Sequence, residues 1–329
     1  MMQFDSQRMK IQRRRLLLAA ASATLAHWPV SGAENSIDAM RAPGPLRVVA
    51  TFSVLADIAR ELGGPAVEVT SLVGPNADAH VFEPTPSDVQ RVARAQLVIT
   101  NGLRFEGWID RLIAASGYRG PIVVASRGVT VRHSAGGADP HAWQDLANGQ
   151  RYAENISTAM LAATSPRAPR YAMEIRGHTA DYLRRLEVLD RDIRARIAAI
   201  PPERRRVITS HDAFGYFADA YGVTFIAPRG WTTGSEPSAK AVAAIVRQAR
   251  ASKASALLVE NISDPRLIER IGRESGLKVG GALYSDALSP VGTEADTYVR
   301  MFEHNVRTLV DAMSPARPVG LDPATAARP

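Results

Sequence analysis

Apolar positions along the chain alternate between two periods. Short runs rich in β-branched residues alternate with longer segments whose apolar residues recur at helical spacing, from about residue 46 to residue 313. This alternation is typical of an α/β fold with parallel sheets. The runs that we interpret as strands form two sets of four: Leu46–Thr51, Val67–Val73, Leu97–Asn101 and Ile122–Ala125, then Val207–Thr209, Val223–Ala227, Ala256–Glu260 and Val279–Leu283. Two sheets of about four strands each follow from this pattern.

Helix signals occupy the intervals between the predicted strands. Ser53–Leu62 places its apolar residues on one side and stops at Gly63, and Thr85, Pro86 and Asp88 form the start signal of another helix. In the second half we expect helices over Ala213–Tyr221, Ser238–Ser252, Pro265–Ser275 (capped by Asp264) and Glu294–Met313. Each sheet is therefore expected to be flanked by helices.

A long helix is predicted between the two halves. Residues 167–200 contain few helix breakers and many charges, and their apolar residues recur at helical spacing: Tyr171, Ile175, Tyr182, Leu186, Leu189, Ile193 and Ile197. Such a helix is about 45 Å long, enough to run along both halves. We therefore expect two α/β lobes, residues 46–166 and 201–313, joined by one backbone helix over 167–200. A Pro- and Ala-rich tail at 314–329 is expected to be disordered.

The first 33 residues have the order of an export signal. The basic run Arg13–Arg15 precedes an apolar stretch that ends near Ala26, too short for a permanent membrane span. Small residues at 31–33 predict cleavage after Ala33. The paired arginines also resemble a twin-arginine signal, although an ordinary secretory signal can contain the same run. We expect a periplasmic protein.

Composition excludes several other classes. The chain is 46% hydrophobic and 22% charged, as in ordinary globular proteins. Of its formal charge of +7, residues 1–33 carry +4, and the rest shows no basic stripe interleaved with aromatics, so we expect no nucleic-acid partner. There is no cysteine, so any metal must be held by nitrogen and oxygen and no cysteine is available for a lipid anchor. We expect a freely diffusing monomer.

Four metal-capable side chains follow predicted strands. His80 lies in the loop after the second strand, His141 in a loop after the fourth, His211 at the tip of the fifth, and Asp286 just after the eighth. Ligands of open parallel sheets bind beyond the carboxyl ends of the strands. Three imidazoles and one carboxylate suit tetrahedral zinc, whereas more carboxylate oxygen would favour manganese.

A zinc-dependent hydrolase is the rival interpretation. Catalytic zinc keeps one coordination position for water, and Asp286 as a fourth ligand would close that position. The chain also has no Gly-x-Ser-x-Gly motif at a strand–helix turn. We therefore expect a binding protein and not an enzyme.

Four ordered segments carry a family resemblance. Residues 79–88, 139–143, 210–217 and 284–289 resemble the signature segments of the cluster A-I family, the zinc- and manganese-binding solute-binding proteins of ABC importers. The resemblance implies two lobes joined by a backbone helix, with a metal ion held between them by His80, His141, His211 and Asp286. It also implies that a divalent transition metal is captured in the periplasm and delivered to the membrane permease of an ABC importer.

Departures from the family pattern bear on the choice of metal. Many zinc-specific members carry a long His-rich loop where this chain has the short segment 131–138, and Ala79 stands where proline is frequent. Manganese and iron binders of the family often present glutamate at the position of His211. We therefore expect zinc first, with manganese or iron(II) as alternatives.

Other polar residues receive plainer interpretations. Asp145 and Asp212 are candidates to orient the ligand imidazoles, a role that metal-bound histidines usually require, and Asp212 is alternatively a helix cap. We expect His133, His178 and His304 to be exposed to solvent, with His133 alternatively an auxiliary metal ligand. Loop networks are expected for Glu83 and Glu260, and packing roles for Trp108 and Trp143.

Overall fold

A computed structural model describes residues 44–134, 137–164, 168–227 and 238–314. The predicted signal peptide and the tail beyond residue 314 lie outside these residues. None of the helices in the described ranges combines the length and the apolar composition needed to cross a bilayer.

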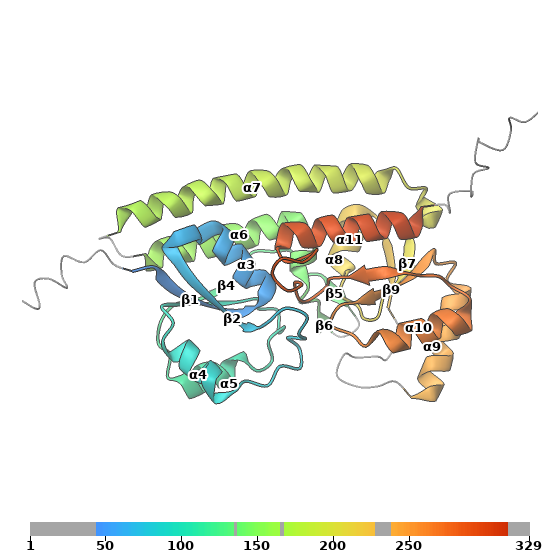
Figure 1. The fold of residues 1–329 in the computed structure, drawn as a ribbon, viewed down its shortest axis with the longest axis horizontal. Coiled ribbons are helices and arrows are strands. Elements are labelled where there is room, and N and C mark those ends of the chain that lie inside the picture. The colour runs from blue at the N-terminus through green and yellow to red at the C-terminus, as the bar shows by residue number, and fades with distance from the viewer. Residues whose placement is uncertain (1–43, 135–136, 165–167, 228–237, 315–329) are drawn as a thin grey trace, which may run out of the picture. The chain divides into compact units, whose positions relative to one another are not determined.

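Two parallel four-stranded sheets form the framework (Figure 1). The first has the order β2-β1-β3-β4 and the second the order β10-β9-β7-β8, with every neighbouring pair parallel. When the second sheet is read from its other edge, both sheets have the same topology. Their strands are β1 (Leu46–Phe52), β2 (Val67–Val73), β3 (Leu97–Thr100) and β4 (Ile122–Val124), then β7 (Arg206–Ile208), β8 (Thr224–Ile226), β9 (Ala256–Glu260) and β10 (Val279–Leu283). The predicted fold class is confirmed.

Helices flank each sheet, as the periodicity predicted. They are α3 (Ser53–Gly63), α4 (Pro86–Ala93), α5 (Ile109–Ser116), α6 (Leu146–Ala163), α7 (Pro169–Ala198), α8 (Gly215–Tyr221), α9 (Ala239–Ala251), α10 (Pro265–Ser275) and α11 (Tyr298–Met313). The predicted start signal at Thr85 is a reciprocal capping box with Asp88, and Asp264 caps α10 by accepting from the backbone of Arg266. Shorter elements are three 3-10 turns, η1 (Gly64–Ala66), η2 (Ala142–Gln144) and η3 (Pro202–Arg204), and the hairpin β5 (His133–Ser134) and β6 (Gly137–Ala138).

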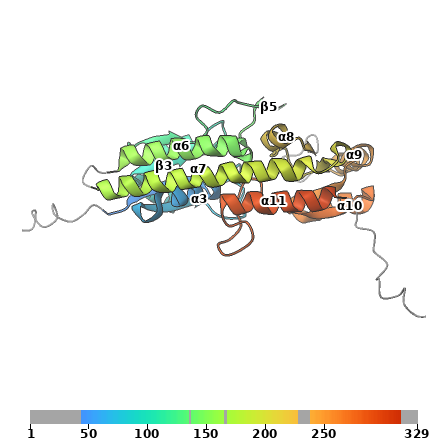
Figure 2. The same ribbon diagram turned by 90° about the horizontal axis from the view of Figure 1, so that it is seen from above.

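The long helix α7 runs over both sheets (Figures 1 and 2). It packs against α3 and α6 of the first lobe and against α8 and α11 of the second. Six of the seven apolar residues predicted to face inward are buried, and Tyr171 is partly buried: Ile175, Tyr182, Leu186, Leu189, Ile193 and Ile197 form the buried row. Charged i,i+4 pairs such as Arg191–Glu187 cover its outer face. This amphipathic division explains why so long a helix is stable here.

Three helices are among the element predictions that the structure corrects. The helix α6 was missed, although it buries Tyr152, Ile156 and Met160. The helix α11 begins at Tyr298 and not at Glu294, because the side chain of Thr297 accepts from the backbone of Arg300 and caps the helix there. The helix α8 begins at Gly215 and not at Ala213.

One hydrophobic core continues from the first sheet to the second. It includes β1 and β3, the inner sides of α3, α6 and α7, and the buried faces of α8 and α11. A smaller core beneath α9 and α10 contains Ile208, Val242, Ile245, Leu257, Ile268 and Ile271. Because interiors at native packing density resist deformation, the shared core opposes movement of one sheet relative to the other.

A buried carboxylate links a helix of the first lobe to a helix of the second. Asp57 of α3 accepts from the backbone amide of Tyr298, the first residue of α11, at 2.7 Å. Burial raises the pKa of Asp57 from its usual value to about 7, against the lowering effect of this hydrogen bond. Between about pH 4 and pH 7 the folded protein therefore holds a proton here that the unfolded chain does not.

We predict that this group makes the metal-free protein less stable as the pH rises. The pKa of Asp57 is higher in the folded than in the unfolded protein. Its stabilising contribution to the free energy of unfolding is therefore fully present below about pH 4 and is lost as the pH rises through about 7. The loss is about 2–4 kcal/mol, because each tenfold difference in proton affinity between the two states corresponds to about 1.4 kcal/mol. Urea unfolding of wild type and Asp57→Asn at pH 4.5, 6 and 8 measures it. The difference between the two proteins should change across this range, and a constant difference would contradict the assignment.

Candidate metal centre

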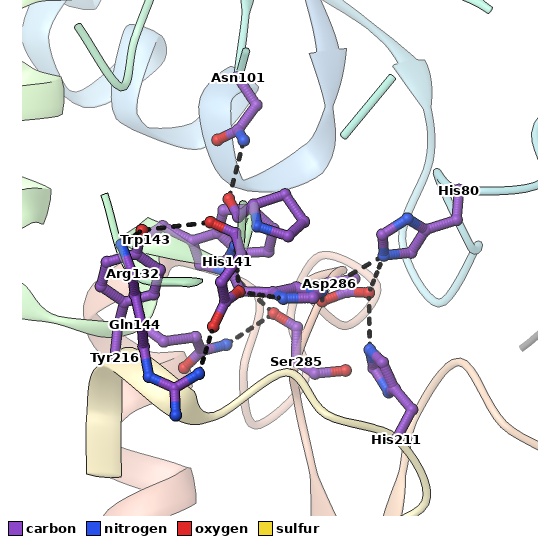
Figure 3. A network of polar contacts seen from close by, with 12 residues as sticks. His80, Asn101, Arg132, His141, Trp143, Gln144, His211, Tyr216, Ser285 and Asp286 are labelled. Atoms are coloured by element: carbon purple, nitrogen blue, oxygen red, sulfur yellow. Dashed lines mark hydrogen bonds and ion pairs between the residues drawn. The ribbon is translucent and has the colours of Figure 1, made fainter. Parts of the chain in front are cut away.

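The side chains of the four predicted ligands point toward one another (Figure 3). His80 lies in the loop that follows β2, and His141 immediately precedes η2. His211 follows β7, and Asp286 follows β10. Each lobe thus supplies two side chains from the carboxyl ends of its strands or the loops beyond them, where open parallel sheets bind ligands.

One carboxylate is the centre of the cluster. Asp286 Oδ2 lies 3.2 Å from His80 Nε2 and 3.2 Å from His211 Nε2, and Asp286 Oδ1 lies 3.7 Å from His141 Nε2. One nitrogen or oxygen atom from each of the four residues lies within 4.8 Å of all the others. Three imidazole nitrogens and one carboxylate therefore surround a volume of the size that a metal ion requires.

The cluster is almost closed to solvent. The side chains of Asp286, His141 and His211 are 0%, 6% and 10% exposed, whereas that of His80 is 27% exposed. The ring of Phe105 packs against His80 with centroids 4.6 Å apart, and that of Trp143 packs against His141 at 5.4 Å. His80 is thus the one of the four that faces solvent most.

Asp286 has no hydrogen-bond donor aligned to either of its oxygens among the described residues. A fully buried carboxylate in this condition is costly unless a cation lies opposite it. Burial would raise the pKa of Asp286, but the charges of His141 and His211 hold it well below its usual value. The site is therefore built to face a positive charge.

Protons are the cations that compete for this position. Burial lowers the pKa of His211, but the charges of Glu260 and Asp286 raise it well above its usual value. The pKa of His80 is also raised, because contact with Asp286 outweighs burial. Both shifts strengthen proton binding by these imidazoles, so a metal ion competes with protons for the same nitrogens.

Two further carboxylates orient the imidazoles from behind. His141 Nδ1–H donates to Asp139 Oδ1 at 2.8 Å, which leaves Nε2 as the lone-pair nitrogen that faces the centre. His211 Nδ1 lies 2.6 Å from Glu260 Oε2, although the two are not aligned as a hydrogen bond. Glu260 is itself fixed, because its Oε1 accepts from the backbone amide of His211 and from Ser210 Oγ.

These contacts correct the prediction for the orienting residues. Asp145 caps α6 by accepting from the backbone of Ala147, and Asp212 is exposed and neither orients an imidazole nor caps α8. Asp139 and Glu260 take the orienting role instead. Glu260 ends β9, the strand beside β7, and the same strand-end argument that identified His211 would have identified it.

Other expectations for nearby residues are mixed. His133 is exposed and Trp108 and Trp143 are buried in the core, as predicted, and Glu83 lies exposed in its loop. His178 and His304 are partly buried, because His178 packs against Gly64 and His304 against Tyr284, so the prediction of solvated side chains was wrong.

Arg132 supports the His141 side of the cluster. Its Nη1 donates to Asp139 Oδ2 at 3.1 Å, and its Nε donates to the 68% exposed Asp219 of α8, also at 3.1 Å. Gly215 leaves room for this arrangement, since a Cβ there would lie 2.3 Å from Arg132 Nη1. Asp139, Glu260 and Asp286 carry three formal negative charges and Arg132 one positive charge. The site therefore carries a net negative charge, which a dication would oppose.

Comparisons with known proteins identify the family. The sequence model of the family described as "ZnuA: Zinc-uptake complex component A periplasmic" matches residues 48–312. The manganese ABC transporter substrate-binding lipoprotein PsaA of Streptococcus pneumoniae is 30% identical over 280 residues, which cover 82% of this chain and 89% of that protein. The iron ABC transporter substrate-binding lipoprotein MtsA of Streptococcus pyogenes serotype M1 is 28% identical over the same shares.

A solved structure shares the fold. The periplasmic zinc binding protein TroA from Treponema pallidum superposes with a TM-score of 0.76 and 28% sequence identity. The superposition covers 83% of this chain and 100% of that chain. The two-lobed architecture described above is therefore that of a known group of binding proteins.

We predict that the orienting carboxylates affect metal binding through the imidazoles. Glu260→Gln and Asp139→Asn should each weaken Zn²⁺ binding about 10–100-fold, the usual effect of removing a partner behind a metal ligand. Asp145→Asn is the matched control and should leave affinity unchanged. Competition with a chromophoric chelator measures all three. Unchanged affinity in both Glu260→Gln and Asp139→Asn would show that neither carboxylate supports a metal ligand.

Proposed function

Because the chain belongs to the periplasmic zinc-uptake component A family, we propose that it captures one divalent transition-metal ion, zinc first, and delivers it to the membrane permease of an ABC-type importer. In this proposal His80, His141, His211 and Asp286 bind the ion. It lies between lobes formed by residues 46–166 and 201–313, which residues 167–200 link. The observation that carries the proposal is the buried Asp286 carboxylate, which has no aligned donor in the described ranges and faces three imidazole nitrogens.

This ligand set suits a protein that carries a metal ion better than a metal-dependent enzyme. Four protein ligands complete a tetrahedral zinc shell, whereas catalytic zinc sites retain one position for water. The family consists of substrate-binding components of transporters, as the names of the relatives state. The protein is therefore proposed to hold its ion as cargo.

The donor atoms favour zinc over the other metals that the relatives bind. The relatives are named for manganese, iron and zinc, so family membership alone does not choose between these ions. Three imidazoles with one carboxylate form a compact, borderline-soft set, whereas manganese prefers more oxygen. Manganese and iron(II) are the alternative cargoes.

Location outside the cytoplasm follows from the family, whose members are periplasmic proteins or lipoproteins. We propose that residues 1–33 are a signal peptide and that the mature protein begins at Glu34, exported by the twin-arginine or the ordinary secretory route. It is proposed to act as a monomer.

One zinc ion should bind each chain and stabilise it. A ligand that binds the folded state alone adds about 4 kcal/mol at a thousandfold excess over its dissociation constant. Calorimetric titration and thermal unfolding at pH 7.5 measure the stoichiometry and the shift in Tm. Affinity should fall as the pH decreases, because protons then occupy the imidazoles whose pKa is raised. A protein that binds no zinc at pH 7.5, or whose Tm does not rise, would contradict the proposal.

Metal preference should depend on His211. Replacing it with glutamate adds a carboxylate that can bind through two oxygens, which favours manganese relative to zinc. The new charge also lies beside Glu260, so the ratio of the two affinities is the informative quantity. We expect this ratio to shift by about tenfold, or about 1.4 kcal/mol.

Competition calorimetry on wild type and His211→Glu measures the ratio. His133→Glu makes the same chemical change at an exposed hairpin position and should leave the ratio unchanged. An unchanged ratio in folded His211→Glu would remove His211 from the ligand set.

A further inference from the structure

Two side chains of the first lobe hold the backbone beside Asp286 of the second. Trp143 Nε1 donates to the carbonyl oxygen of Ser285 at 2.9 Å, and Gln144 Nε2 donates to the same oxygen at 2.7 Å (Figure 3). All three residues are 0% exposed. The carbonyl thus has both of its acceptor positions occupied by donors from across the contact between the lobes.

The clamped carbonyl belongs to the peptide bond that leads into Asp286. Because a peptide unit is planar, two donors on its oxygen fix the plane and with it the Cα of Asp286. The donors follow His141 by two and three residues, and Tyr298 of α11 donates to the carbonyl of Trp143 in the same turn. The short segment that begins with His141 in the first lobe is therefore hydrogen-bonded to the backbone beside Asp286 in the second lobe.

Asp286 depends on this external support. Within the described ranges its carboxylate oxygens contact only the ligand imidazoles, at 3.2 to 3.7 Å and without an aligned donor, so no group outside the ligand set orients this side chain. The orienting carboxylate Glu260 differs, because Ser210 and the backbone of His211 both donate to it. The backbone of Asp286 therefore determines where its carboxylate lies.

Burying the Gln144 side chain at this position costs folding free energy. Its Oε1 is buried and has no hydrogen-bond partner among the described residues, and burial of an unpaired polar atom costs about 1–3 kcal/mol. An apolar side chain would avoid that cost but would lose the Nε2–H that reaches Ser285. Trp143 already satisfies the carbonyl with one donor, so stability alone does not explain a second donor.

We propose that Gln144 is a positioning residue for metal capture, which holds Asp286 at the distance from His141 that the ion requires. The proposal rests on the proposed function and deepens it, since it names a residue outside the ligand set that adjusts the same site. Gln144 touches no ion; it acts through the Ser285–Asp286 peptide.

The test compares Gln144→Met with Ser285→Ala. Gln144→Met keeps the length and volume of the side chain and removes both the donor and the unpaired oxygen. Ser285→Ala removes a second buried, unpaired oxygen, Ser285 Oγ, but retains the carbonyl that is clamped. The two variants therefore make similar changes to buried polarity, and Gln144→Met alone releases the peptide.

Two readouts separate positioning from general destabilisation. Zn²⁺ affinity is measured by chelator competition, and the visible absorption of the Co²⁺-loaded protein reports ligand geometry at saturation. Gln144→Met should weaken zinc about tenfold and change the Co²⁺ spectrum, with the metal-free urea midpoint close to wild type. Ser285→Ala should match wild type in affinity and in spectrum.

The outcomes distinguish this proposal from the proposed function. Wild-type affinity and spectrum in Gln144→Met would overturn the positioning role, and so would equal losses in Ser285→Ala. Failure of wild type itself to bind zinc, manganese or iron(II) would overturn the function instead. If Gln144→Met does not fold without metal, Gln144→Asn replaces it, because the shorter amide cannot reach Ser285 and should give the same tenfold loss.

Discussion

The buried charge of Asp286 is the constraint on which the site depends. A carboxylate without exposure and without aligned donors in the described ranges requires a cation within contact distance. Protonated imidazoles supply that charge in acid, and a dication supplies it once the imidazoles are neutral. Asp139 and Glu260 lie behind the rings of His141 and His211, so the nitrogens that face the centre are the ones free to bind metal.

The fold brings this cluster together by repeating one topology. Each sheet contributes two of the four side chains from its strand ends or the loops beyond them, and the two sheets share one core. Because close-packed interiors deform little, the separation of the donor atoms is set by the core and by the contacts across the lobes. The clamp on Ser285 is one such contact, and the Arg132 link between Asp139 and α8 is another.

Much of this architecture could be predicted from local pattern. Strands such as Val67–Val73 and Ala256–Glu260 were predicted to the residue. Four of the seven residues of Val67–Val73 are β-branched, and Ala256–Glu260 is apolar up to Glu260, and short runs of these kinds between polar or turn residues have few alternatives. The helix α6 was missed because its buried side includes Gly149 and Ser157, which carry no apolar signal; Gly149 is there to admit the ring of Tyr298. Strand ends pointed to His80, His141, His211 and Asp286, which the structure brings together. Asp139 and Gln144 could not be found in this way, because they make contacts whose direction only the folded backbone defines.

The central claim is that one ion is bound by these four side chains together. A crystal structure of the protein loaded with one equivalent of zinc, with anomalous data at the zinc edge, tests it directly. The account predicts a single peak bound by Nε2 of His80, His141 and His211 and by an oxygen of Asp286, at about 2.0–2.2 Å. A peak elsewhere, or an ion that lacks Asp286 among its ligands, would contradict it.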